Sequence, residues 1–141
     1  MSEETFLESI PDEFWRTVEE ARQDPERLRV LLKRMSRDEL VRFAWTYEAL
    51  ANELRAEQYW TPELSDDGLF ELAHWVLAQG KDYYERVWEN AEEMPREKKR
   101  SPGLLHAIEA EYEERFGEDI PLNTNEWDEE WKSHGKKTPW G

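Results

Sequence analysis

The apolar residues of segment 36–60 recur at spacings of three and four, and nothing interrupts the pattern before Trp60. Such spacing places one apolar stripe along a single helix, formed by Leu40, Phe43, Tyr47, Leu50 and Leu54. Ser36 stands three residues before Glu39, which is the spacing of a capping box, where each side chain accepts from the other residue's amide. The pattern predicts a long central helix that begins after Ser36.

Other segments carry the same helical punctuation, with a proline or a capping residue before each apolar stripe. Further helices are predicted over 11–23, 25–35, 69–79, 81–92 and 102–116, with caps at Asp24 and Ser101 and stops at Gly80 and Gly117. The basic segment 94–103 between them is expected to be an exposed loop. Because no strand alternation or repeat occurs, we expect an all-α fold with about six helices.

Length and charge limit the organisation and the partners of the chain. Its 141 residues suit one domain, predicted at 1–121, followed by an acidic, tryptophan-containing tail at 122–141 that packs on the domain or is partly ordered. The 34 acidic and 19 basic residues give a net charge of -15, which repels nucleic acid and anionic membranes and attracts cationic surfaces. Plain solubility is the other interpretation of that charge.

Several classes of site are excluded or disfavoured. The chain has no cysteine, which rules out disulfides, thiolate zinc sites and cysteine nucleophiles. Neither a signal-peptide pattern nor a run of about 18 apolar residues occurs, so we expect a cytoplasmic protein without membrane contact. No catalytic motif is present, and the three histidines, His74, His106 and His134, do not form a dense ligand set, so no catalytic residue, metal or cofactor is assigned.

The stretch LSDDGLFELAHWVLAQGKDY, residues 64–83, admits two interpretations. If Asp66 or Asp67 caps the helix, a carboxylate and the imidazole of His74 fall near one face and a ligand pocket is conceivable. The residues assigned to that pocket are Trp15, Asp66, Asp67, His74, Trp75 and Tyr83. The alternative is a helix start, in which Ser65 and the two aspartates satisfy free amides while His74 is a surface or half-buried side chain.

Two further aromatic features are informative. Phe14 and Trp15 are consecutive, so one ring is expected to face the core and the other the rim of a cleft. In the tail, two tryptophans four residues apart share one helical face and are flanked by carboxylates. This segment either docks on a basic partner or packs on its own domain, and its partner-binding candidates are Glu126, Trp127, Asp128, Glu129, Glu130 and Trp131.

These motifs are similar to those of a bacterial family catalogued as domain of unknown function four-two-four-zero. The resemblance rests on Phe14-Trp15, on Ser65 to Gly68, on Trp75 to Gly80 and on AEYEERFGEDIP at 110–121. It departs from the family in the extra Leu69 and in the bulky QYWTPEL before Ser65. The resemblance implies a bacterial helical domain, sometimes fused to other modules, and brings no activity with it.

Together these features favour a non-catalytic protein-binding module whose partner presents a basic surface. One version is an inhibitor or immunity-type protein that covers a cationic active site. The alternative is a small-ligand-binding or enzymatic domain with its pocket at Ser65–Gly68. A structural accessory module without a ligand of its own is a third hypothesis.

Overall fold

The computed structural model describes residues 9–55, 59, 65–95, 97 and 99–121, and within them the chain forms helices and no strand. The helices are α2 (Asp12–Ala21), α3 (Pro25–Leu32), α4 (Arg37–Glu53), α5 (Asp66–Ala78), α6 (Lys81–Glu89), the 3-10 turn η2 (Ala91–Glu93) and α7 (Leu104–Phe116). The predicted all-α class is confirmed. The tail at 122–141 lies outside the described residues.

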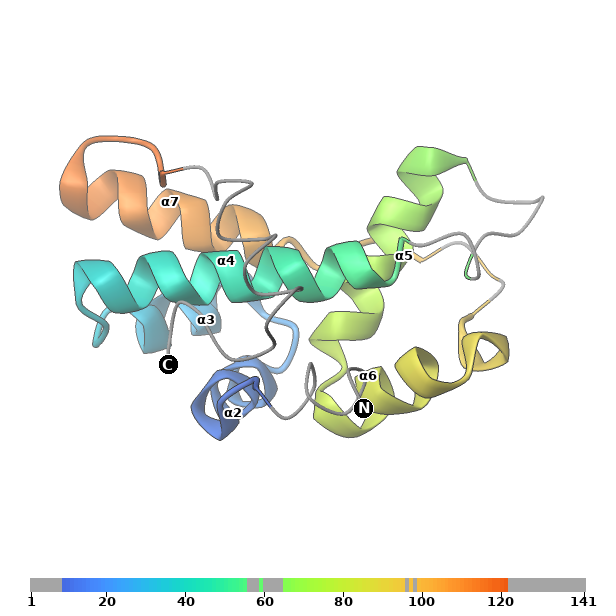
Figure 1. Cartoon of the computed structure of the whole chain (residues 1–141). Helices are drawn as coiled ribbons and strands as arrows, with labels where there is room; N and C mark the ends of the chain where they lie inside the picture. Colours follow the sequence, from blue (N-terminus) through green and yellow to red (C-terminus); the bar gives the residue numbers. More distant parts are fainter. Residues whose placement is uncertain (1–8, 56–58, 60–64, 96, 98, 122–141) are drawn as a thin grey trace.

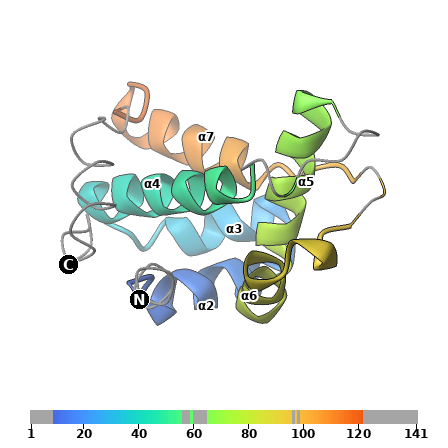
Figure 2. The same ribbon diagram turned by 45° about the vertical axis from the view of Figure 1, so that its right-hand side comes forward.

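Helix α4 runs through the middle of the molecule (Figure 1). Helix α7 lies antiparallel along one side of it, and α3 packs against both α7 and α2. Helix α5 lies near the carboxyl end of α4 and is steeply inclined to it. Helix α6 packs on α5, as the second view also shows (Figure 2). The described residues therefore form a bundle of α2, α3, α4 and α7 with the α5–α6 pair at one end.

Helix α2 is covered on two sides, which buries both aromatic residues of its Phe-Trp pair. The ring centroid of Phe14 lies 4.9 Å from that of Phe43 in α4, and the centroid of Trp15 lies 5.4 Å from that of Tyr84 in α6. The expectation that one of the two rings faces the rim of a cleft is therefore wrong. Periodicity within α2 identifies one apolar face, but it does not reveal that α6 covers the neighbouring face.

The capping box at the start of α4 is confirmed, and the helix ends before the apolar pattern of the sequence does. The backbone N–H of Ser36 donates to Glu39 Oε1 at 2.8 Å, and the N–H of Glu39 donates to Ser36 Oγ at 3.2 Å. The helix ends at Glu53 because the N–H of Leu54 turns to the carbonyl of Ala51 at 3.2 Å, a tightened final turn. Leu54 is buried although it lies beyond the last residue of the helix, so the apolar stripe in the sequence extends past the helix end.

Glycines end two helices as predicted, while the start of α7 differs. Gly80 has φ 112° and Gly117 has φ 70°, both in the region that favours glycine. Helix α7 begins at Leu104 with Gly103 at its N-cap, whereas Ser101 Oγ accepts from the N–H of Gly103 at 3.2 Å. Because the backbone of Gly103 is left-handed, with φ 79°, the helix cannot begin at Pro102, and this turn precedes α7 instead of capping it.

Helix α6 is shorter than the sequence pattern suggests, and the segment that follows it is more buried. Asn90 interrupts the predicted helix at 81–92, because its side chain accepts from the N–H of Glu92 at 3.1 Å and starts η2. Met94, expected at the beginning of an exposed loop, is buried in the core. Further along, Glu97 and Arg100 are exposed, as expected for a loop.

Candidate functional site

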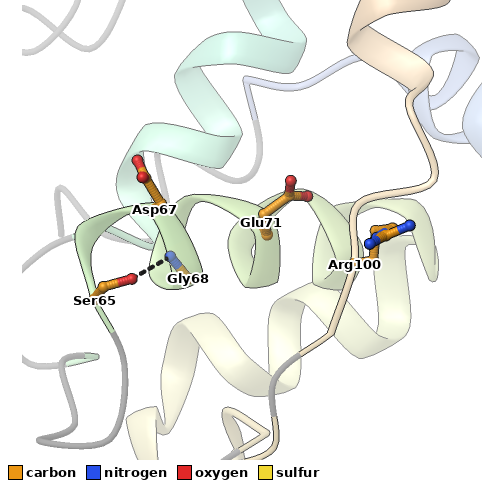
Figure 3. A pocket seen from close by; sticks show the side chains of 5 residues that line it. All are labelled: Ser65, Asp67, Gly68, Glu71 and Arg100. Carbon is orange, nitrogen blue, oxygen red and sulfur yellow. Dashed lines mark hydrogen bonds between the residues drawn. The ribbon is translucent and has the colours of Figure 1, made fainter.

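The first turn of α5 is capped by Ser65, whose Oγ accepts from the N–H of Gly68 at 3.1 Å (Figure 3). The prediction that Ser65 satisfies free amides at a helix start is confirmed, and neither aspartate is the N-cap residue. The side chain of Asp67, two positions after Ser65, is exposed to solvent. Asp66 is the first residue of α5, and its side chain lies outside the described part of the structure.

A cavity of about 610 Å³ opens at this helix start, lined by Ser65, Asp67, Gly68, Glu71 and Arg100. Figure 3 shows the carboxylates of Asp67 and Glu71 on the same side of α5, with Arg100 on the connection that runs beside the helix. The lining thus combines two carboxyl groups with one guanidinium. This combination favours a ligand that carries both charges.

The connection that brings Arg100 to the cavity is held on α5 by Lys99 and Ser101, the residues before and after Arg100. The N–H of Ser101 donates to Glu71 Oε2 at 2.7 Å. Lys99 Nζ lies 5.1 Å from the ring centroid of Trp75, a cation–π contact. Because both neighbours are anchored one turn apart on the same helix, the position of Arg100 beside α5 follows from the fold.

The remaining sequence candidates lie elsewhere. Of the five pocket candidates whose side chains the structure describes, only Asp67 lines the cavity. Trp15 is in the core, and the half-buried rings of Trp75 and Tyr83 meet edge to face with centroids 5.7 Å apart. Arg86 covers the Tyr83 ring at 5.2 Å, so this aromatic pair is flanked by cations. The tail candidates Glu126 to Trp131 lie outside the described residues.

His74 is buried, with 3% of its surface exposed, which corrects the expectation of a surface or half-buried side chain. Its ring centroid lies 5.5 Å from that of Tyr47 and 4.4 Å from that of Phe70. Burial lowers the pKa of His74 to about 4, while the charge of Glu71 raises it and that of Arg55 lowers it. The imidazole is therefore neutral at neutral pH.

A second group of carboxylates lies where α4 and α7 run side by side. Glu48 of α4 is half-buried, and its pKa is raised by burial and by the negative charge of Glu109 on α7. Sequence reasoning missed this pair, because it depends on which two helices pack together. It also missed Glu71 and Arg100, although the excess of basic residues at 96–100 was a usable signal for the latter.

Two other kinds of feature are absent from the described ranges. No group of three or more His, Asp or Glu side chains there is arranged to hold a metal ion. Within the same residues, no helix combines the length and the apolar character needed to cross a membrane.

The described residues thus define an all-α domain with a charged cavity at one helix start and paired carboxylates over a helix pair. The chain belongs to the family described as Protein of unknown function (DUF4240), whose sequence profile matches residues 1–121. The resemblance seen in the motifs is therefore confirmed. No curated protein and no solved structure matches the chain.

Proposed function

We propose that the chain is a non-catalytic binding module whose partner presents a basic surface. The observation that carries the proposal is the position of Glu48 and Glu109 on the packed helices α4 and α7, where burial and then the charge of Glu109 raise the pKa of the half-buried Glu48. Like charges in this arrangement destabilise each other, and a cation placed between them relieves the repulsion. An arginine or lysine of a partner supplies that cation.

The pairing of charges inside the domain favours the same function. Arg29 pairs with Glu111 at 3.2 Å and also with Glu114, and Arg37 pairs with Glu118. These basic side chains are therefore engaged within the chain, while the excess of 34 acidic over 19 basic residues remains. Such a field raises the association rate with cationic surfaces.

Apolar side chains flank the carboxylates and give a partner something to bury. Trp45 stands one turn before Glu48 on α4, Leu105 stands one turn before Glu109 on α7, and both are half-buried. The indole N–H of Trp45 donates to the carbonyl of Pro121 at 2.9 Å, which fixes the ring on this surface. We call Trp45, Glu48, Leu105 and Glu109 the α4–α7 face. A rigid aromatic anchor beside charges is a typical composition for a protein interface.

An inhibitor or immunity-type protein that covers a cationic active site is one form of this function. The test is affinity capture from source cells with three proteins: wild type, Glu48→Gln with Glu109→Gln, and a control with Glu20→Gln and Glu26→Gln. The control removes the same charge from exposed positions in α2 and α3. A basic protein retained by wild type and control, but lost from the face variant and at high salt, supports the proposal. Equal retention by all three proteins contradicts it.

The cavity at the start of α5 favours a second candidate function, the binding of a small ligand. Asp67 and Arg100 both line it, and neither has a partner among the described residues. Opposite charges in one cavity match a small molecule that carries a cationic group close to an anionic one. A volume of about 610 Å³ is within the range of small-molecule sites.

A thermal-shift panel of zwitterionic, purely cationic and purely anionic metabolites separates the two functions. If the cavity binds a ligand, zwitterions stabilise the wild type, and the stabilisation is lost in Asp67→Asn and in Arg100→Gln but not in Asp82→Asn, an exposed control on α6. If no compound shifts the melting temperature, or if the shift survives both cavity variants, this second function is wrong.

A further inference from the structure

The interface between α4 and α5 contains two buried polar atoms that have no hydrogen-bond partner among the described residues. They are the hydroxyl oxygen of Tyr47 and Nδ1 of His74. The exposed fraction of Tyr47 is 0% and that of His74 is 3%. Buried polar atoms in folded proteins are nearly always hydrogen-bonded, to protein or to ordered water. Two unsatisfied atoms on contacting side chains therefore indicate a shared ligand.

The geometry of the two rings disfavours a direct bond between them. They are stacked, with centroids 5.5 Å apart and planes inclined by 30°. A phenol O–H and an imidazole nitrogen both form their hydrogen bonds close to the plane of their own ring. The rings lie face to face, and no hydrogen bond joins the hydroxyl of Tyr47 to Nδ1 of His74. One small molecule that is hydrogen-bonded to both atoms would satisfy them together.

The surroundings specify what kind of molecule this is. Phe14 on one side and Phe70 on the other enclose the stack, with centroids 6.5 Å from Tyr47 and 4.4 Å from His74. The charged groups that act on the imidazole are Glu71 and Arg55, and burial keeps it neutral near pH 7. An ion is therefore disfavoured. A neutral molecule that both donates and accepts hydrogen bonds satisfies a hydroxyl and an imidazole nitrogen together.

We propose that one buried water molecule binds at the edge of the Tyr47–His74 stack and bridges the phenol hydroxyl to Nδ1. This water joins α4 to α5 through a polar contact inside an otherwise apolar interface. Buried waters in this role typically make about three hydrogen bonds to groups that lack other partners. The site is independent of the α4–α7 face and of the cavity, since neither residue belongs to either.

A crystal structure that resolves ordered water tests the proposal directly, with wild type and Tyr47→Phe compared. Phenylalanine keeps the stacked ring and removes only the hydroxyl. The expected result is a water within about 3 Å of both atoms in the wild type and its loss in the variant. A dry interface, or a direct bond between Tyr47 and His74, overturns the proposal.

A solution measurement provides an independent readout. In protein with ¹⁵N-labelled histidine, the Nδ1 signal of His74 is expected to shift on Tyr47→Phe, because its bound water loses one of its partners. His106, which is exposed on α7, serves as the internal control and keeps its signal. If the His74 signal is the same in both proteins, no bridge exists. If Tyr47→Phe fails to fold, the wild-type crystal structure alone decides.

Discussion

The carboxylate of Glu19 in α2 accepts a hydrogen bond from the backbone N–H of Lys81, the first residue of α6, at 2.9 Å. A side chain sixty-two positions away thus caps a helix whose own N-cap, Gly80, has no side chain to do so. Asp12 adds a contact at 3.8 Å from its Oδ1 to Lys81 Nζ. Helix α2 therefore determines where α6 begins, and the Gln79-Gly80 stop is a contact site for another helix.

Gly80→Ala is expected to destabilise the fold by roughly 1–3 kcal/mol, because φ 112° with ψ 177° is a conformation that only glycine adopts readily. An added Cβ would also lie 3.0 Å from Cγ of Glu19. Gly117→Ala is the matched control, since a Cβ there meets nothing within 4 Å and only the left-handed backbone is strained. Urea denaturation should show the larger loss for Gly80→Ala, and equal losses would mean that the contact with Glu19 is unimportant.

Glu19→Ala removes the acceptor at the start of α6, and the expected loss is roughly 0.5–2 kcal/mol, the usual cost of a helix cap. The neighbouring Glu20→Ala is the control, because that exposed side chain makes no such contact. Comparison of the two free energies of unfolding, with hydrogen exchange at the first amides of α6, checks the prediction. Faster exchange confined to the Glu19 variant is the expected pattern.

His74 makes stability depend on pH. Its pKa in the folded protein is about 4, below the ordinary value of 6.5, so the unfolded chain takes up a proton at a higher pH than the folded one. Stability is therefore lost as the pH falls from about 6.5 towards 4, by up to about 3 kcal/mol for a shift of this size.

Carboxylates also titrate near the lower end of this range, so the contribution of His74 is measured as the difference between the wild type and a His74 variant. His74→Leu should reduce the slope of stability against pH between 6.5 and 5, whereas the exposed His106→Gln should leave it unchanged. Chemical denaturation at half-unit steps gives both slopes. A His74 variant with the wild-type slope would show that the pKa of His74 is not lowered in the folded protein.

Ser65→Ala and Asp67→Asn separate the two interpretations of the SDDG stretch. Ser65→Ala loses the hydrogen bond to Gly68 and should lower stability by roughly 1 kcal/mol. Asp67→Asn removes a charge near the positive end of α5 but no cap, so its loss should be smaller, at roughly 0.3–1 kcal/mol. Thermal unfolding of both variants tests the ranking, and the reverse order would assign the capping role to Asp67.

Much of the fold was predictable because helix boundaries are written in local residue types. The capping box of Ser36 and Glu39, the Asp24-Pro25 start and the glycine stops all act within a few residues, and each is confirmed. Asp24 Oδ1, for example, accepts from the N–H of Glu26 at 3.0 Å. Errors arose where a local signal competed with tertiary contacts, as at Ser101, whose N–H is bound by Glu71.

The candidate site was less predictable, because its members come from segments far apart in the sequence. Asp67 was identified from its position at a helix start, but Arg100 reaches the cavity only through the anchoring of Lys99 and Ser101 on α5. His74 and Trp15 are polar or amphipathic aromatics whose burial depends on neighbouring helices. Side-chain type alone does not distinguish such residues from those that line a pocket.

The central claim is that the α4–α7 face is the contact for a basic partner. Its most direct test is an amide NMR map of the labelled chain during titration with a lysine-rich peptide at low and at high salt. We expect the largest shifts near Glu48 and Glu109, their loss at high salt, and their reduction in the Glu48→Gln, Glu109→Gln variant but not in the Glu20→Gln, Glu26→Gln control. Shifts that spread evenly over the acidic surface, or that concentrate at Asp67 and Glu71, would contradict the claim.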